Sequence, residues 1–356
     1  MINRTKTRKI MVGNVQIGGN NEVVIQSMTN TNTKDWKATV KQIKELQETG
    51  CEIIRVSVPD MESAKNIKLI KKHIKIPLVA DIHFDHKLAI ESIKQGIDKL
   101  RINPGNIGSK EKVMELVKEA KKAHIPIRIG VNAGSLKEVH EFSSTKDKAK
   151  ALVKAAVEHV KILEDCDFGD IAVSLKASNV ETTVEAYKLF ATKRNYPIHL
   201  GITEAGSIFR GTIKSSVGLG IMLAQGLGDT IRVSLTANPV EEVRVAYQIL
   251  QSLGLRSTGV EVISCPTCSR TKVNLIKIVD ELEKELAKVQ NKSTRKNIKI
   301  AVMGCVVNGP GEAKEADFGI AGGIGEGILF QKGKIICKVP EDKWVKKLLS
   351  MYKKSI

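Results

Sequence analysis

The chain is dominated by a repeated pattern in which a short apolar run is followed by a stretch of helical periodicity. The pattern occurs eight times between residues 22 and 253, and the runs are Val23–Ile25, Ile53–Ile54, Leu78–Ala80, Lys99–Leu100, Ile127–Ile129, Ile171–Val173, Ile198–Leu200 and Thr230–Ile231. Strands that alternate with helices indicate βαβ crossovers and a parallel sheet. Eight such units in about 250 residues predict a closed (β/α)8 barrel. An open doubly wound sheet is the alternative, but no Gly-rich dinucleotide fingerprint follows the first run.

The first of these units shows the helical half of the pattern. Thr33 is a good N-cap residue, and we expect the helix to begin near it. Trp36, Val40 and Ile43 then fall on one face, as in an amphipathic helix. Gly50 follows as a C-terminal stop signal.

Polar side chains follow the apolar runs at the ends where a barrel places its active site. Five of these ends are cationic, and they carry Arg55, Arg101, Arg128, Lys176 and Arg232. Cations that converge on one mouth repel each other unless an anion neutralises them, and guanidinium groups bind phosphate oxygens in a bidentate manner. We therefore predict a phosphorylated substrate.

Other strand ends supply acid/base and orienting groups, and the residues are Asp81, His83, Asn103, Asn132 and Glu204. We assign the two asparagines to substrate binding and the other three to catalysis. A structural ion pair explains any one charged residue of this set about as well as a site does. The repeated placement at strand ends is what favours a site.

The pattern changes near residue 260, which predicts domains at 1–255 and 256–356, the second a small α+β domain. Cys265 and Cys268 lie in Ser-Cys-Pro-Thr-Cys, and Cys305 follows a second apolar run. Three thiolates on loops after strands fit zinc, an iron–sulfur cluster or a dithiol redox pair. The last histidine is His199, so the second domain has none to offer as a ligand.

Two residues compete for the fourth ligand position. Cys337 could complete a four-cysteine site, but it lies in an alternating run where we expect a buried structural cysteine. Glu312 follows the Gly-rich turn 308–311. A cluster with three cysteines and this weaker ligand would leave one iron open to a substrate.

The order of the elements makes a prediction about assembly. Each barrel helix returns the chain to the face opposite the active site, so the second domain leaves its barrel far from the mouth. The segment 254–259 is short for swinging the domain round. We therefore expect a head-to-tail homodimer with two-fold symmetry, in which the metal of one subunit serves the mouth of the other.

Charge and hydropathy limit the partners. Lys and Arg number 57 against 39 Asp and Glu, a formal charge of +18. That excess fits a lysine-rich solvated surface, an acidic partner protein, a phosphorylated substrate or nucleic acid. Aromatic residues make up only 4%, which argues against a platform for stacking bases.

No secretory signal follows the basic N-terminus and no run is long enough to span a membrane, so we expect a cytoplasmic protein.

Five motifs make the sequence recognisable. They are Val-Ala-Asp-Ile-His-Phe-Asp at 79–85, Asp-Lys-Leu-Arg-Ile-Asn-Pro-Gly-Asn-Ile-Gly at 98–108, Gly-Ile-Thr-Glu-Ala-Gly at 201–206, Ser-Cys-Pro-Thr-Cys at 264–268 and Asn-Gly-Pro-Gly-Glu at 308–312. Together they resemble the 4-hydroxy-3-methylbut-2-en-1-yl diphosphate synthase family in its two-domain bacterial form. The resemblance covers essentially the whole chain. It implies the reductive ring opening of 2-C-methyl-D-erythritol 2,4-cyclodiphosphate in the methylerythritol phosphate route to isoprenoids.

The resemblance also implies a set of site residues. A [4Fe-4S] cluster would be held by Cys265, Cys268, Cys305 and Glu312. The cyclic diphosphate would be bound at positions matching Arg55, Arg101, Arg128, Lys176, Arg232 and Ser234, with Asn132 nearby. Glu204 would donate a proton, and Asp81 and His83 would assist or orient. The implied partners are flavodoxin or ferredoxin as electron donor and a second subunit placed head to tail, without nucleic acid.

A rival hypothesis belongs to a different functional class. In it the chain is a zinc-binding, nucleic-acid-interacting protein with a barrel domain. Cys265, Cys268, Cys305 and Cys337 would hold the zinc, and the excess lysines would contact phosphates.

Overall fold

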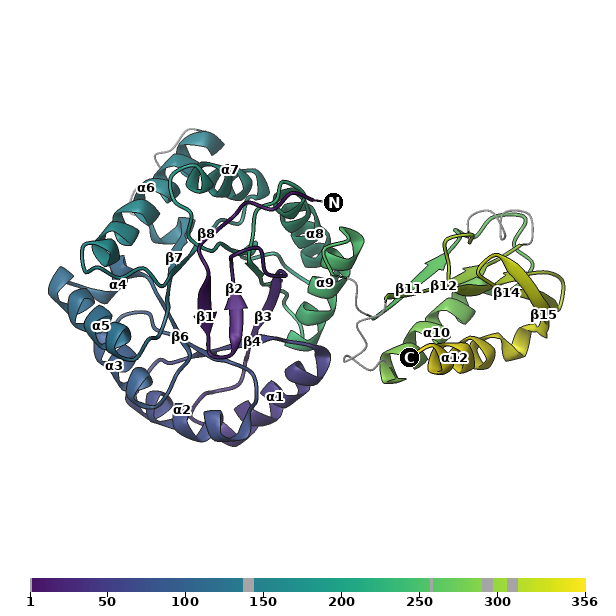
Figure 1. Ribbon diagram of the computed structural model, residues 1–356, viewed down its shortest axis with the longest axis horizontal. Coiled ribbons are helices and arrows are strands. Elements are labelled where there is room, and N and C mark those ends of the chain that lie inside the picture. The colour runs from purple at the N-terminus through teal and green to yellow at the C-terminus, as the bar shows by residue number, and fades with distance from the viewer. Residues whose placement is uncertain (1, 137–143, 257–258, 290–296, 306–312) are drawn as a thin grey trace. The chain divides into compact units, whose positions relative to one another are not determined.

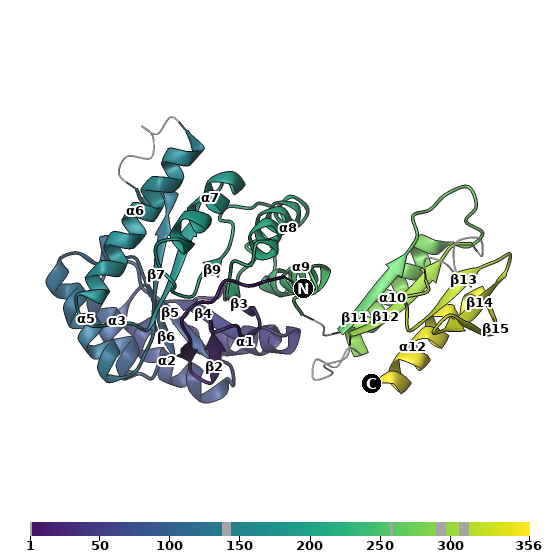
Figure 2. The ribbon, with the colours of Figure 1, turned by 45° about the horizontal axis from the view of Figure 1, so that its top comes forward.

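The computed structural model describes residues 2–136, 144–256, 259–289, 297–305 and 313–356. The chain divides into two compact units, Met1–Arg256 and Ser257–Ile356. Figures 1 and 2 show a ring of helices around strands in the first unit and a sheet with helices in the second. Each unit is described by itself below.

The first unit is a (β/α)8 barrel, as predicted. Its parallel strands pair in the order β8-β7-β6-β5-β4-β3-β10-β9, and a bridge between Val173 and Ile198 joins the two ends of the sheet. The open-sheet alternative is therefore wrong. The strands are β3 (Val24–Met28), β4 (Ile53–Ser57), β5 (Leu78–Asp81), β6 (Lys99–Ile102), β7 (Ile127–Asn132), β8 (Ile171–Lys176), β9 (His199–Leu200) and β10 (Thr230–Ile231).

Helices surround the barrel and bury their apolar faces against the outer side of the strands. They are α1 (Trp36–Thr49), α2 (Met61–His73), α3 (His86–Lys94), α4 (Pro104–Ile107), α5 (Lys110–Lys122), α6 (Thr145–Glu164), α7 (Val180–Ala191), α8 (Ile208–Ala224) and α9 (Pro239–Ser252). Ile43, Ile67 and Leu116 from three of these helices belong to one buried core with the outward strand residues. This core is what fixes the strand ends in place.

The start of α1 corrects one prediction. The helix begins at Trp36, and its N-cap is Asp35, whose side chain accepts a hydrogen bond from the N–H of Ala38. Thr33 is buried instead and donates to the carbonyl of Ser57. The residue that caps the helix is therefore Asp35, a carboxylate directly before it, and not Thr33. Gly50 ends the helix as expected, at a φ of 100° that favours glycine.

Side chains alternate along each strand between the helices and the barrel interior. On β6, Leu100 and Ile102 join the outer core, which turns Lys99 and Arg101 inward. The amino end of the barrel is closed by a hairpin of β1 (Ile10–Val12) and β2 (Val15–Ile17), which was not predicted from the sequence. The hairpin packs on Val24, Ile53, Val79 and Ala172 near the start of four strands, and it crosses the middle of the ring in Figure 1.

The second unit is a small α+β domain, as predicted. Its sheet has the order β11-β12-β13-β14-β15, parallel across the first three strands and antiparallel across the last three. α10 and α12 pack on it through a core that includes Leu282 and Trp344. The elements are β11 (Gly259–Ser264), α10 (Leu275–Val289), β12 (Asn297–Met303), β13 (Phe318–Gly322), β14 (Glu326–Gln331), β15 (Lys334–Pro340) and α12 (Trp344–Ser355).

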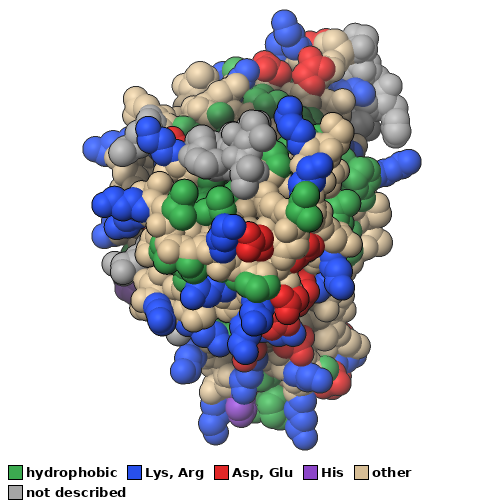
Figure 3. Space-filling view, turned by 90° about the vertical axis from the view of Figure 1, so that its right-hand side faces the viewer, with side chains coloured by type: hydrophobic (Ala, Val, Ile, Leu, Met, Phe, Trp, Pro, Cys, Tyr) green, Lys and Arg blue, Asp and Glu red, His purple; other side chains and the backbone are tan. Residues whose placement is uncertain are grey.

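The surface carries the positive charge that the composition indicates. Figure 3 shows lysine and arginine side chains scattered over one face, with acidic side chains between some of them. In the described part of the chain, no helix combines the length and the apolar character needed to cross a membrane.

Candidate active site at the barrel mouth

A polar pocket of about 210 Å³ lies at the carboxyl ends of the barrel strands. The five predicted cations meet there with Asp81, His83, Asn132 and Ser234. Ser174 and Thr203 also line the pocket, and neither was predicted from the sequence. Ser174 could have been found, because it precedes Lys176 by two residues on one strand and therefore shares its face.

Two glycines make room for the long cations. A Cβ atom at Gly130 on β7 would lie 2.6 Å from Nε of Arg101, and one at Gly201 would lie 2.8 Å from Nζ of Lys176. Both distances are too short for any other residue without movement of the cation. A glycine in a strand usually marks a close approach of this kind. The barrel wall is therefore shaped around the charged side chains.

Asp81 on β5 is the carboxylate around which the mouth is arranged. Its side chain lies 3.1 Å from Nη1 of Arg101, 3.3 Å from Nε2 of His83 and 3.7 Å from Nε of Arg55. Burial alone would raise the pKa of Asp81, but the charges of Arg55 and Arg101 and the hydrogen bond from His83 hold that pKa well below its ordinary value. Asp81 is thus ionised and orients three neighbours.

Glu242 on α9 supplies a second buried carboxylate. Its Oε2 lies 3.4 Å from Nε of Arg232, and its Oε1 accepts a hydrogen bond of 3.1 Å from the N–H of Leu235. Met28 contacts a neighbouring cation, since its Sδ accepts a hydrogen bond of 2.8 Å from Nη2 of Arg55. Glu242 was not predicted from the sequence, because it lies in a helix rather than at a strand end.

Positive charge nevertheless exceeds negative charge at the mouth. Arg128 is only 1% exposed, and its Nε and Nη1 have no hydrogen-bond partner among the described residues. Lys99 lies on the inner face of β6, fully buried, and its Nζ is without a partner in the same part of the structure. Burial, and after it the charge of Arg128, lowers the pKa of Lys99 and of Lys176 well below the ordinary lysine value. The pocket therefore favours an anion.

Two predicted residues lie outside the lining of this pocket. The side chain of Asn103 accepts a hydrogen bond from the N–H of Gly105 and so caps α4. Glu204 is exposed in the segment that follows β9, directly after Thr203. Its φ of 53° is uncommon for a residue other than glycine, and such conformations gather at functional sites. Roles for Asn103 in substrate binding and for Glu204 in proton transfer stay predictions.

Three of the four cysteines of the second unit lie on loops that follow two neighbouring strands of its sheet. Cys265 follows β11 and Cys305 lies just beyond β12, and these two strands are parallel neighbours. The N–H of Gly304 donates to Sγ of Cys265 at 3.2 Å. The N–H of Lys272 donates to the carbonyl of Gly304 at 3.0 Å, so the loop that carries Cys268 is tied to the one before Cys305.

Not every predicted ligand is described. Glu312 lies outside the described residues, and among those that are described no three His, Cys, Asp or Glu side chains are close enough together to hold a metal ion. Hydrogen bonds, first from the N–H of Arg270, lower the pKa of the exposed Cys268 thiol. The expectation that Cys337 is buried is wrong, since it is exposed on β15, at the opposite end of the sheet from β11.

The Asp81 network predicts a pH-dependent loss of stability in an Asp81→Asn variant. Removing one partner of a buried ion pair costs about 3–5 kcal/mol, so the free energy of unfolding should fall by that amount at pH 7. Because the folded pKa of Asp81 is depressed, its contribution is present above the unfolded pKa of about 3.9 and disappears as the pH falls further. The difference between the two proteins, measured by urea unfolding, should be constant from about pH 6 to 8 and shrink below about pH 4.

Asp170→Asn is the matched control, because Asp170 is an exposed carboxylate of the same barrel. An Asp81 variant that loses no more stability than this control would contradict the assigned network.

Comparison with known proteins finds a family domain in each of the two units. The family model described as the GcpE TIM-barrel domain matches residues 7–247, and the model described as the GcpE protein C-terminal domain matches residues 261–354. A dihydropteroate synthase from Yersinia pestis has a TM-score of 0.51 at 12% identity, covering 69% of this chain and 98% of that one. At such low identity this likeness shows the barrel fold alone.

Sequence relatives are much closer. A protein of Clostridium perfringens named 4-hydroxy-3-methylbut-2-en-1-yl diphosphate synthase (flavodoxin) is 58% identical over 350 residues, 98% of this chain and 99% of the relative. A protein of the same name from Clostridium acetobutylicum is 56% identical over 97% of this chain and 98% of its own length.

Proposed function

The chain belongs to the family of 4-hydroxy-3-methylbut-2-en-1-yl diphosphate synthases, the GcpE family, and from this premise we propose that it opens the ring of 2-C-methyl-D-erythritol 2,4-cyclodiphosphate. The protein is an oxidoreductase of isoprenoid biosynthesis. In the proposed reaction a C–O bond of the cyclic substrate breaks, two electrons and two protons enter, and water leaves. The product is the allylic hydroxy diphosphate.

The observation that carries this proposal is the excess of buried cations at the barrel mouth. An anionic partner would stabilise two of these buried cations. Arg128 has two nitrogens without a hydrogen-bond partner among the described residues, and Lys176 has a lowered pKa. Each hydrogen bond from such a cation to a phosphate oxygen contributes about 1.5–3 kcal/mol. The diphosphate gains further charge as the ring opens, so the same cations stabilise the product side of the reaction.

Proton delivery is the second task of the mouth. We assign it to Glu204, because a carboxyl group beside the pocket can protonate the departing oxygen. Its left-handed backbone conformation supports a positioned role. Asp81 holds Arg101 and His83 in fixed orientations through its ion pairs.

A [4Fe-4S] cluster fits the donors of the second unit. Cys265, Cys268 and Cys305 would hold it, with Glu312 as fourth ligand. The hydrogen bond from the N–H of Gly304 to Sγ of Cys265 is of the kind that tunes such clusters. A Cβ at Gly304 would lie 2.9 Å from Thr271, which fits a loop kept free of a side chain. When bound, the cluster supplies electrons one at a time at low potential.

Partners follow from the same proposal. The named relatives support flavodoxin as electron donor, with ferredoxin as the alternative, and the charge of +18 suits an acidic donor. We also propose a cytoplasmic head-to-tail homodimer in which the cluster of one subunit serves the mouth of the other. The rival zinc-binding, nucleic-acid-interacting protein finds no support among the relatives.

The decisive experiment is purification without oxygen. We expect a brown protein with about four irons and four sulfides per chain, as a [4Fe-4S] cluster requires. With reduced flavodoxin it should convert the cyclic diphosphate to the allylic product, followed by phosphorus NMR. Removal of iron by a chelator should abolish turnover. A colourless, zinc-loaded protein that binds DNA in a salt-sensitive manner would contradict the proposal and favour its rival.

A further inference from the structure

Lys99 is enclosed in the barrel, one step below the mouth. It precedes Arg101 by two residues on β6, so both side chains lie on the inner face of that strand. The lining of the mouth pocket includes Arg101 but not Lys99. Lys99 is paired in register with Val79 of β5, which belongs to the apolar cluster around the hairpin at the amino end. Its side chain therefore starts from the apolar layer beneath the mouth, and it is 0% exposed.

The amino group of Lys99 lacks the surroundings that stabilise a positive charge. Its Nζ has almost no exposed surface and no hydrogen-bond partner in the described part of the chain. The two buried carboxylates of the mouth, Asp81 and Glu242, form ion pairs with arginines instead. Burial, and after it the charges of Arg128 and Arg55, lowers the pKa of Lys99 well below the ordinary lysine value. These surroundings favour the neutral amine.

An anion at the mouth changes this balance. Arg55 and Arg128, whose charges act on Lys99, both line the pocket. An anion that binds these two guanidinium groups offsets their charge, and its own negative charge acts on Lys99 through an interior from which water is excluded. Ligand binding and proton binding then strengthen each other, because such coupling is reciprocal.

We propose that Lys99 takes up a proton from solution when a diphosphate occupies the mouth, and releases it when the diphosphate leaves. Lys99 then supplies positive charge beneath the ligand only while the ligand is bound. This inference rests on the proposed function and extends it. The added charge favours the reaction, because the diphosphate becomes more negative as the ring opens.

Other groups of the interior are less suited to take this proton, or contribute separately. His199 on β9 is also fully buried, but imidazole is a weaker base than a lysine amine by about four pH units. The arginines keep their protons at neutral pH. Lys176, which also has a lowered pKa, and His83, which is half exposed beside Asp81, line the pocket itself. Their contributions are present in the wild type and in a Lys99 variant alike, so the difference between the two proteins reports Lys99.

Isothermal titration calorimetry with the cyclic diphosphate measures the proton. The full chain is prepared without oxygen and titrated without a reductant, so that the ligand binds but does not turn over. Titrations at about pH 8 in buffers of different ionisation enthalpy give the number of protons taken up. Lys99→Met should take up about one proton fewer per chain than the wild type. Between about pH 7 and 9 the affinity of the wild type should also fall more steeply with rising pH, by up to about tenfold per pH unit relative to the variant.

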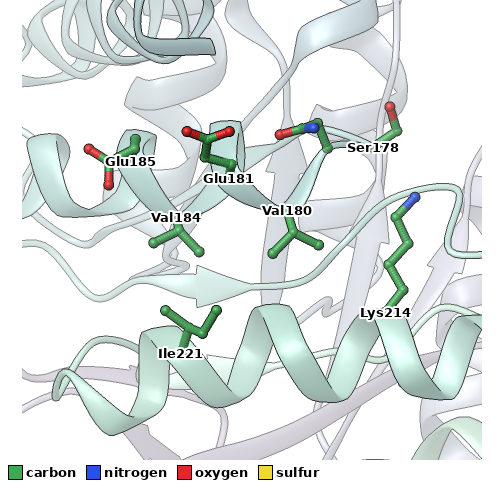
Figure 4. Close-up of a pocket in the computed structure, with 8 residues that line it drawn as sticks. Ser178, Val180, Glu181, Val184, Glu185, Lys214 and Ile221 are labelled. Carbon is green, nitrogen blue, oxygen red and sulfur yellow. The ribbon is translucent and has the colours of Figure 1, made fainter.

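Lys214→Met is the control, because it removes a lysine from the outside of the same barrel. Lys214 extends from α8 into a pocket of about 580 Å³ between α7 and α8, with Glu181 on the facing helix (Figure 4). This variant should keep the proton uptake of the wild type. Equal uptake by the wild type and Lys99→Met would overturn the proposal, and so would an equal loss in the Lys214 control.

Two further choices keep the test decisive. Lys99→Gln is neutral at every pH and replaces Lys99→Met if that protein does not fold, with the same expected result. A wild type that does not bind the cyclic diphosphate would refute the proposed function instead. Inorganic pyrophosphate then gives the same comparison for Lys99, because the protons of the ligand itself cancel in the difference between the two proteins.

Discussion

Replacing Cys265 with serine is expected to abolish ring opening and to reduce the iron bound by anaerobically purified protein to near zero. Cys265 follows β11 and accepts a hydrogen bond from the N–H of Gly304, so it is held beside the start of the loop that carries Cys305. A serine hydroxyl is a harder and far less acidic ligand than a thiol, so the proposed site should bind its cluster far more weakly once one of its three thiolates is lost. Iron and sulfide analysis and the visible spectrum measure the loss.

Cys337→Ser is the control for this experiment. Cys337 is exposed on β15, at the opposite end of the sheet from β11, so its replacement should leave iron content and turnover unchanged. Glu312→Ala then tests the fourth ligand, and it should lower cluster stability while Cys337→Ser does not. The ligand assignment is wrong if the Cys265 variant stays brown or if the Cys337 variant turns colourless. Circular dichroism should show the same helix and strand content in all three variants.

The barrel could be predicted because its signal is repeated. Each of eight short runs is ambiguous by itself, but their regular alternation with helical stretches admits few architectures. The position of the pocket could be predicted for the same reason, because the carboxyl ends of barrel strands meet on one face whatever the sequence of each strand. Arg55, Arg101 and Arg128 were therefore placed together before their contacts could be known, and the pocket contains all three.

Features that lie outside this repeated pattern were missed or predicted wrongly. Glu242 belongs to α9, and only the packing of that helix against β3 brings its carboxylate to Arg232. The hairpin β1–β2 was not predicted because each of its strands has only three residues, too few to show a periodic pattern. Cys337 was expected to be buried on the evidence of alternation, but β15 is an edge strand with most of its side chains exposed. Local patterns do not reveal which strand lies at an edge.

The mouth also shows why function and stability oppose each other in this barrel. Arg55, Arg101 and Arg128 lie close together, and burial with neighbouring charges lowers the pKa of Arg55 to about 10. Asp81 and Glu242 offset part of the repulsion, but Arg128 has no ion pair among the described residues. Burying an unpaired cation destabilises the free protein. The same cation is then available to an anionic substrate.

Arg128→Met is therefore expected to have opposite effects on activity and stability. Two charge-assisted hydrogen bonds to phosphate, each worth about 1.5–3 kcal/mol, disappear, so kcat/KM should fall by about 10²–10⁴. The free protein should become more stable by about 1–4 kcal/mol, because methionine fills similar space without an unpaired buried charge. Thermal unfolding measures the second effect. Inorganic pyrophosphate should raise the Tm of the wild type and leave that of the variant nearly unchanged.

Arg244→Met is the control that shows what the loss of an exposed arginine does to activity and stability. Arg244 lies on the exposed side of α9 and forms a surface ion pair of 2.7 Å with Glu241, so neither kcat/KM nor Tm should change much. An Arg128 variant that is several kcal/mol less stable than the wild type would mean that a partner already satisfies this guanidinium in the free protein. Unchanged kcat/KM would mean that the substrate does not reach it. Only the combination of a more stable protein and a lost response to pyrophosphate fits a cation held unpaired for an anionic ligand.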